Sequence, residues 1–148
     1  MLTLNLPVYE FTISHGIPAK IFDFIRKRYV ALTPEEWVRQ NFLKFLVTEK
    51  KYPQSLILVE QTLQVHQMKK RCDAVIYDNS ARPLMIIEFK KPEVAISQAV
   101  FDQIARYNIP LKVKYLMVSN GLQHFCSYID FDNNTYHFLE DIPQYTSL

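Results

Sequence analysis

The sequence predicts an α/β fold in which a mixed central sheet lies between helices, and three observations support this. A capped amphipathic helix is expected at about 33–49. Two apolar runs rich in β-branched residues, 71–77 and 85–92, flank a turn-forming segment and indicate a hairpin of strands. A second helical segment precedes another apolar strand at 115–120. With a long strand at 56–65, the order of the core is α-β-β-β-α-β.

The N-terminal region is expected to form an arm that precedes the core. Residues 1–17 alternate between polar and apolar side chains, and Pro7 restricts the first run to an edge strand or an extended arm. The pattern over 17–30 fits either a strand or a short helix.

The first helix carries strong start signals. Thr33 can cap it, Pro34 suits the first helical position, and Glu36 completes a capping box. Apolar residues at helical spacing should form its buried stripe: Val38, Phe42, Phe45 and Leu46.

The second half of the chain predicts one more helix and three strands. Pro92 should open a helix that ends near Asn108. Three apolar runs predict a parallel, central strand and two extra C-terminal strands: 115–120, 125–129 and 136–139. The tail after Pro143 is expected to be loose.

Composition limits the classes of protein to consider. The 148 residues predict a single domain over 1–148, with an arm at 1–30, a core at 31–130 and a C-terminal strand and tail at 131–148. Two glycines cannot supply a phosphate-binding loop, so no ATPase motor is expected. Two cysteines without ligand spacing argue against zinc. No signal peptide or membrane span is predicted, and a cytoplasmic location is expected.

Three ionisable residues lie inside the apolar hairpin. Asp73 is near the start of its first strand, and Glu88 and Lys90 near the end of the second, where alternate residues share a face. Charge in an apolar sheet is costly unless it is paired or bound to metal. Two carboxylates and an ammonium at one sheet edge suit a divalent cation, a water and a phosphate. An ion-pair network at the sheet edge is the structural alternative.

Each of these residues has an expected role in phosphodiester hydrolysis. Asp73 and Glu88 would ligate Mg²⁺ or Mn²⁺, with the carbonyl of Phe89 as an additional ligand. Lys90 would orient or polarise the water and offset negative charge as it builds.

A carboxylate of the first helix is a further candidate ligand. Glu36 could complete the metal shell, although capping Thr33 would occupy the same carboxylate. If Glu36 is occupied by the helix cap, Glu35 is the alternative metal ligand.

Two further groups of residues are candidates for binding substrate. Gln103 and Tyr107 are four residues apart and therefore share one face of the second helix, where they could touch substrate or support Lys90. The alternative is a polar margin of a packed helix. Three basic residues next to Asp73 are expected to hold a phosphate backbone: Lys69, Lys70 and Arg71.

Four features of the sequence together carry a family resemblance: the run 21–40, Asp73, the Glu88-Phe89-Lys90 triplet and the Gln103-x-x-x-Tyr107 pair. They resemble the N-terminal domain of type I restriction enzyme R subunits, within the PD-(D/E)xK nuclease superfamily. The likeness covers roughly 20–130. It implies a restriction-endonuclease-like fold, catalytic roles for Asp73, Glu88 and Lys90, and the family's Q-x-x-x-Y motif at Gln103 and Tyr107. Cys72 replaces the usual proline before the first acid.

The resemblance implies a Mg²⁺- or Mn²⁺-dependent DNA endonuclease. R subunits continue into an ATP-driven translocase, so a stand-alone relative or a module that works with a separate motor or specificity subunit is expected. The sequence leaves a homodimer open. The alternative function is a non-catalytic DNA-binding or assembly module with the same fold. A third hypothesis is a structural protein in which the acids and the lysine form only ion pairs.

Overall fold

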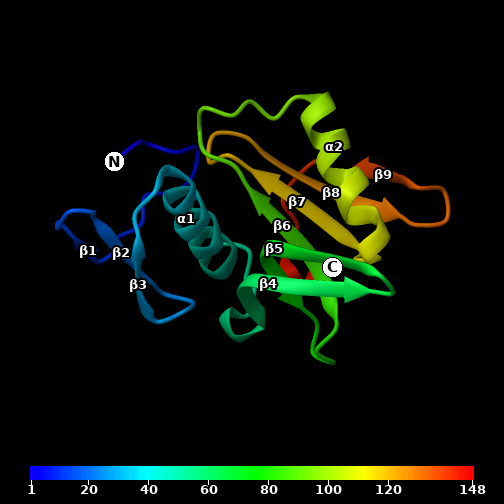
Figure 1. Ribbon diagram of the computed structural model, residues 1–148, viewed down its shortest axis with the longest axis horizontal. Coiled ribbons are helices and arrows are strands. Elements are labelled where there is room, and N and C mark those ends of the chain that lie inside the picture. The colour runs from blue at the N-terminus through cyan, green and yellow to red at the C-terminus, as the bar shows by residue number, and fades with distance from the viewer.

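The core of the protein is a six-stranded mixed sheet with one helix on each face (Figure 1). The computed structural model describes residues 1–148. The strands occur in the order β4-β5-β6-β7-β8-β9, with these bounds: β4 Ile57–Val65, β5 Met68–Tyr77, β6 Pro83–Phe89, β7 Tyr115–Ser119, β8 His124–Asp130 and β9 Thr135–Phe138. Strands β6 and β7 are parallel, and the other neighbours are antiparallel.

The helices are α1, Pro34–Thr48, and α2, Gln98–Asn108. The order α1-β4-β5-β6-α2-β7 confirms the predicted α/β class and the restriction-endonuclease-like core, and β8 and β9 are the extra C-terminal strands. Neither helix is long and apolar enough to cross a membrane.

Alternation along the central strands separates two apolar layers. Ala74 and Ile87 pair across β5 and β6 and belong to the cluster that packs on α1. Val75 and Ile86 pair in the next position and belong to the cluster that packs on α2. Because consecutive residues of a strand point to opposite faces, one hairpin supports both helices.

Helix α1 begins as predicted. The backbone N–H of Glu36 donates to Thr33 Oγ1 at 3.0 Å, and Pro34 is the first helical residue. The reciprocal half of the capping box is missing, because the Thr33 N–H donates to the carbonyl of Ala31. Phe42, on the buried face, contacts Phe89 of β6 edge to face at 5.8 Å between ring centroids.

Helix α2 begins later than Pro92, and the prediction of its start was wrong. Ser97 Oγ accepts from the N–H of Val100 at 3.2 Å and caps the helix. The preceding segment is held as a loop, since the side-chain amide of Asn120 donates to the carbonyl of Val94 at 2.8 Å. A serine cap with a tertiary hydrogen bond therefore outweighed the proline signal.

The N-terminal region forms a second, three-stranded antiparallel sheet beside α1 (Figure 1). Its strands are β1 Ile13–Ser14, β2 Lys20–Asp23 and β3 Arg28–Ala31. The ambiguous region 17–30 is thus two strands rather than a helix.

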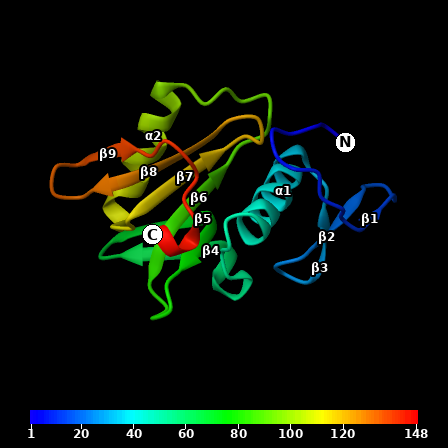
Figure 2. The ribbon, with the colours of Figure 1, turned by 180° about the vertical axis from the view of Figure 1, so that it is seen from behind.

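The C-terminal tail is packed rather than loose. Its last turn, Tyr145–Ser147, lies on the same face of the sheet as α1 (Figure 2). The Tyr145 ring contacts Tyr52 at 5.6 Å between centroids, and its hydroxyl donates to the carbonyl of Tyr77 at 3.1 Å. The sequence carried no periodic signal there, because these contacts are long-range.

Candidate active site

Asp73 and Glu88 lie on neighbouring strands where the β5–β6 ladder ends. Ala74 pairs with Ile87, and Asp73 and Glu88 are the next residues in the same register. The N–H of Phe89 donates to Asp73 Oδ2 at 2.7 Å, which fixes the orientation of that carboxylate. Burial raises the pKa of Asp73 above its ordinary value, and the negative charge of Glu88 adds to this effect. The two predicted acids are therefore close enough to repel each other.

Lys90 follows β6 directly. Its N–H donates to the carbonyl of Ser119 at 2.9 Å, which ties this end of β6 to β7. None of the ion pairs in the structure involves the ammonium of Lys90. The charge of Lys90 acts to lower the pKa of Glu35 on α1, but burial of Glu35 has a larger effect and raises it. The third predicted residue is thus half-buried near the carboxylates, with its charge unpaired.

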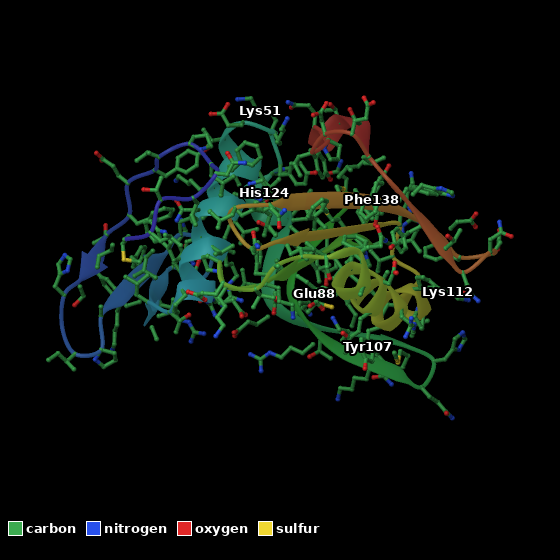
Figure 3. All side chains as sticks on the ribbon, turned by 90° about the horizontal axis from the view of Figure 1, so that it is seen from above. Lys51, Glu88, Tyr107, Lys112, His124 and Phe138 are labelled. Carbon is green, nitrogen blue, oxygen red and sulfur yellow. The ribbon has the colours of Figure 1, made fainter.

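Glu88 of β6, labelled in Figure 3, forms an ion pair with Lys70 of β5. The Lys70 ammonium also lies 3.3 Å from Oδ1 of Asn108, the last residue of α2. Lys70 was predicted to bind a phosphate backbone together with Lys69 and Arg71, but the structure separates it from them.

Lys69 and Arg71 lie on the outer face of the β4–β5 hairpin. Lys69 pairs with Gln64 and Arg71 with Thr62, and all four residues are exposed. The Arg71 guanidinium donates to Glu60 at 2.8 Å.

The acid of α1 that faces the site is Glu35. The Glu36 carboxylate accepts hydrogen bonds from Arg26 at 2.9 Å, Arg39 Nε at 3.0 Å and Gln40 at 2.9 Å. Burial opposes ionisation of Glu36, but the hydrogen bonds and charge of Arg39 keep its pKa below the ordinary value. Glu35 is exposed, yet partial desolvation and then the charge of Asp73 raise its pKa.

Two residues that the sequence analysis did not single out also bear on the site. Arg39 is buried in α1, contacts Glu36, and lowers the pKa of Asp73 by its charge. Its position four residues after Glu35 was the available signal, because this spacing places side chains on one helical face. Asn108 had no such signal, since its contact with Lys70 joins residues far apart in the sequence.

Gln103 and Tyr107 share the exposed side of α2, as their spacing predicted. Tyr107 is 57% exposed and labelled in Figure 3, and neither side chain makes a hydrogen bond within the protein. Tyr107 directly precedes Asn108, so it lies at the end of α2 that contacts Lys70. Both residues are free to contact a bound molecule.

The donor chemistry of the site suits a hard divalent cation. Carboxylates from Asp73, Glu88 and Glu35 are the oxygen ligands that such cations prefer. Burial, and to a smaller extent the charges of neighbouring carboxylates, raise the pKa of Asp73 and Glu35, and a bound cation would stabilise their ionised forms. In the conformation described, no three Asp, Glu, His or Cys side chains are grouped closely enough to hold a metal. In the same conformation, one oxygen of the Glu88 carboxylate is engaged by Lys70.

Comparison with known proteins identifies one family. A family model described as type I restriction enzyme R protein N terminus (HSDR_N) matches residues 34–143. The match begins at the first residue of α1 and includes the whole six-stranded sheet, but not the N-terminal sheet. No match to a curated protein was found.

Proposed function

This chain belongs to the type I restriction enzyme R protein N-terminal family, and from that premise we propose that it is a metal-dependent DNA endonuclease domain. Asp73, Glu88 and Lys90 would form its catalytic centre. The observation that carries the proposal is the adjacency of Asp73 and Glu88 at the end of the β5–β6 ladder. Lys90 follows Glu88 by two residues and has no ion-pair partner.

The residues of the chain have distinct tasks in this proposal. Asp73 and Glu88 would hold Mg²⁺ or Mn²⁺, with the Phe89 carbonyl and Glu35 as further donors. A cation bound there would supply electrophilic activation of a phosphate and of a water. The Phe89 N–H holds the Asp73 carboxylate in one orientation, so less reorganisation is needed on binding.

Lys90 provides the positive charge of the centre that no acid neutralises. The hydrogen bond to Ser119 anchors the backbone of Lys90, and its ammonium would offset charge that accumulates on the scissile phosphate. Such stabilisation is larger in a partly desolvated site than in water.

Surfaces on either side of the centre would bind DNA. Lys69 and Arg71 present cations on the outer face of the β4–β5 hairpin, beside the hydrogen-bonding side chains of Thr62 and Gln64. Gln103 and Tyr107 extend from α2 on the other side of Lys70. Sequence selection would come from a separate specificity subunit.

A second candidate function is a DNA-binding or assembly module that does not cleave. One observation favours it: the Glu88 carboxylate is neutralised by Lys70, and no group of three ligand side chains is assembled. This candidate predicts DNA binding without metal-dependent cleavage.

Plasmid cleavage with Mg²⁺ or Mn²⁺ separates the two functions. The Lys90→Ala variant should cleave at least about a hundredfold more slowly than the wild type, because it loses the unpaired charge next to the phosphate. Lys91→Ala is the matched control: it removes an adjacent, exposed lysine and should leave the rate nearly unchanged. Both variants should keep the thermal stability of the wild type.

Two results would count against the nuclease proposal. One is equal cleavage by the wild type and Lys90→Ala, which would indicate a contaminating nuclease. The other is DNA binding by the wild type with no cleavage under either metal, which would support the non-catalytic module.

A further inference from the structure

The Lys70–Glu88 ion pair places a positive side chain on a carboxylate that the proposed function assigns to metal binding. Glu88 is a proposed metal ligand, and its carboxylate is already in contact with an ammonium. Only 22% of the Lys70 side chain and 14% of the Glu88 side chain are exposed. An ion pair in this setting is screened much less by water and salt than one on the surface.

The alternation of the β4–β5 hairpin turns Lys70 inward. Its cross-strand partner is Leu63, which is buried in the apolar layer under α2. Lys69 and Arg71, on either side of it, are exposed. Strand geometry therefore directs one lysine of this basic run toward the catalytic centre and leaves its two neighbours in solvent.

Asn108 holds the Lys70 ammonium from the opposite side. Asn108 is only 3% exposed, and its side-chain N–H donates to the carbonyl of Ile104 at 2.7 Å. That hydrogen bond fixes which way the amide faces, so its oxygen Oδ1 is the atom presented to Lys70, at 3.3 Å. The ammonium thus has two oxygen partners, one charged and one neutral, on separate elements.

Charge explains why an ammonium is favourable at this position. Burial raises the pKa of Asp73 and Glu35, and repulsion among Glu35, Asp73 and Glu88 adds to this effect. The charge of Lys70 lowers the pKa of Asp73 and so opposes this repulsion. The side chain performs the electrostatic task that a bound cation would otherwise perform.

We propose that Lys70 is an internal counterion that occupies the Glu88 carboxylate in the cation-free protein and thereby sets the affinity of the site for divalent metal. The inference rests on the proposed metal site. Lys70 contacts one oxygen of Glu88, Oε1. A metal ion that takes this oxygen must displace the ammonium, and a metal ion on the other oxygen meets its positive charge, so in both cases Lys70 weakens metal binding. Asn108 remains as a partner for the displaced ammonium.

Titration with Mn²⁺ by calorimetry tests the proposal without measuring activity. Lys70→Met keeps the length and apolar stem of the side chain and removes the competing charge. Lys69→Met is the matched control, because it removes the same charge one residue away, from an exposed side chain with no ion-pair partner. Any general effect of net charge on metal affinity appears in both variants.

Lys70→Met should bind Mn²⁺ about tenfold or more tightly than Lys69→Met, because a charge-assisted hydrogen bond no longer has to break. Without metal, Lys70→Met should melt at a lower temperature than Lys69→Met, since the acids lose their counterion. Saturating Mn²⁺ should remove most of that difference.

The outcomes distinguish this inference from the proposed function. Equal affinities in the two variants, or weaker binding by Lys70→Met, would overturn the counterion role and leave the metal site intact. If neither the variants nor the wild type binds Mn²⁺, the counterion role and the proposed metal centre both fail.

Discussion

The carboxylates in and near helix α1 are of two kinds. Those paired with arginines are structural, and those without an arginine partner are the candidate catalytic acids. Asp23 and Glu36 are buried and paired with arginines, and the pKa of each lies below its ordinary value despite the opposing effect of burial. Asp73 and Glu35 have raised pKa values. Burial is the main cause of both shifts, and carboxylates whose pKa is raised by burial together with neighbouring charge are typical of functional sites.

The raised pKa of Asp73 predicts that this residue destabilises the cation-free protein at neutral pH. A carboxyl group with a higher pKa in the folded than in the unfolded state binds more protons when folded, so raising the pH through that range lowers the free energy of unfolding. Asp73→Asn removes the charge and keeps an oxygen for the Phe89 N–H. Without metal, it should therefore melt at a higher temperature than the wild type at pH 7.

Thermal melts across pH 3 to 7 provide the check. The advantage of Asp73→Asn should shrink as the pH falls toward the ordinary range of aspartic acid, where the wild-type residue is also neutral. Asp78→Asn is a control of opposite sign, because backbone hydrogen bonds from Arg82 and Ser80 lower the pKa of Asp78. A lower melting temperature for Asp73→Asn at pH 7 would contradict this account of the site.

At the scale of elements, a network of arginines and acids joins the N-terminal sheet to the core. Arg26 lies in the β2–β3 turn and contacts Asp23, Glu36 of α1 and Glu60 of β4. Arg39 of α1 contacts Glu36 and also reaches Glu60. The same network holds Arg39 near Asp73, so it connects the attachment of the N-terminal sheet with the electrostatics of the site.

Removing Arg26 should be costly because it leaves Asp23, which is fully buried, without its ionic partner. Breaking a buried ion pair from one side costs about 3–5 kcal/mol, and we expect Arg26→Ala to lower the free energy of unfolding by about 3 kcal/mol. Arg71→Ala also removes a guanidinium from Glu60, but the Arg71 side chain is 67% exposed. It should cost less than about 1 kcal/mol.

Urea denaturation of the two arginine variants measures both values. The comparison is matched, since each variant loses one positive charge and one contact with Glu60. Similar losses of stability in the two variants would show that the buried network does not hold the N-terminal sheet to the core.

At the scale of the whole molecule, the sequence predicted the core more completely than the regions around it. The order α1-β4-β5-β6-α2-β7 was predictable because capping residues and strand alternation are local signals. The early start assigned to α2 and the loose tail were wrong because the hydrogen bonds of Asn120 and Tyr145 are long-range. No local pattern decided between strand and helix at 17–30.

The candidate site was predictable in its composition but not in its contacts. The predicted hairpin placed Asp73 and Glu88 together, and the structure agrees. The sequence could not show that Glu36 is paired with Arg26 or that Lys70 is paired with Glu88. Both contacts join residues on different elements, which no local pattern predicts. The catalytic and metal-binding roles remain predictions.

Diffraction from crystals soaked in Mn²⁺, with the anomalous signal of the metal, shows whether Asp73 and Glu88 share a cation. We expect a manganese peak in contact with carboxylate oxygens of Asp73 and Glu88, with the Lys70 ammonium withdrawn from Glu88. The Lys90 ammonium should remain free of any carboxylate. Absence of manganese at these two acids in the soaked crystals, with Lys70 still paired to Glu88, would contradict this expectation.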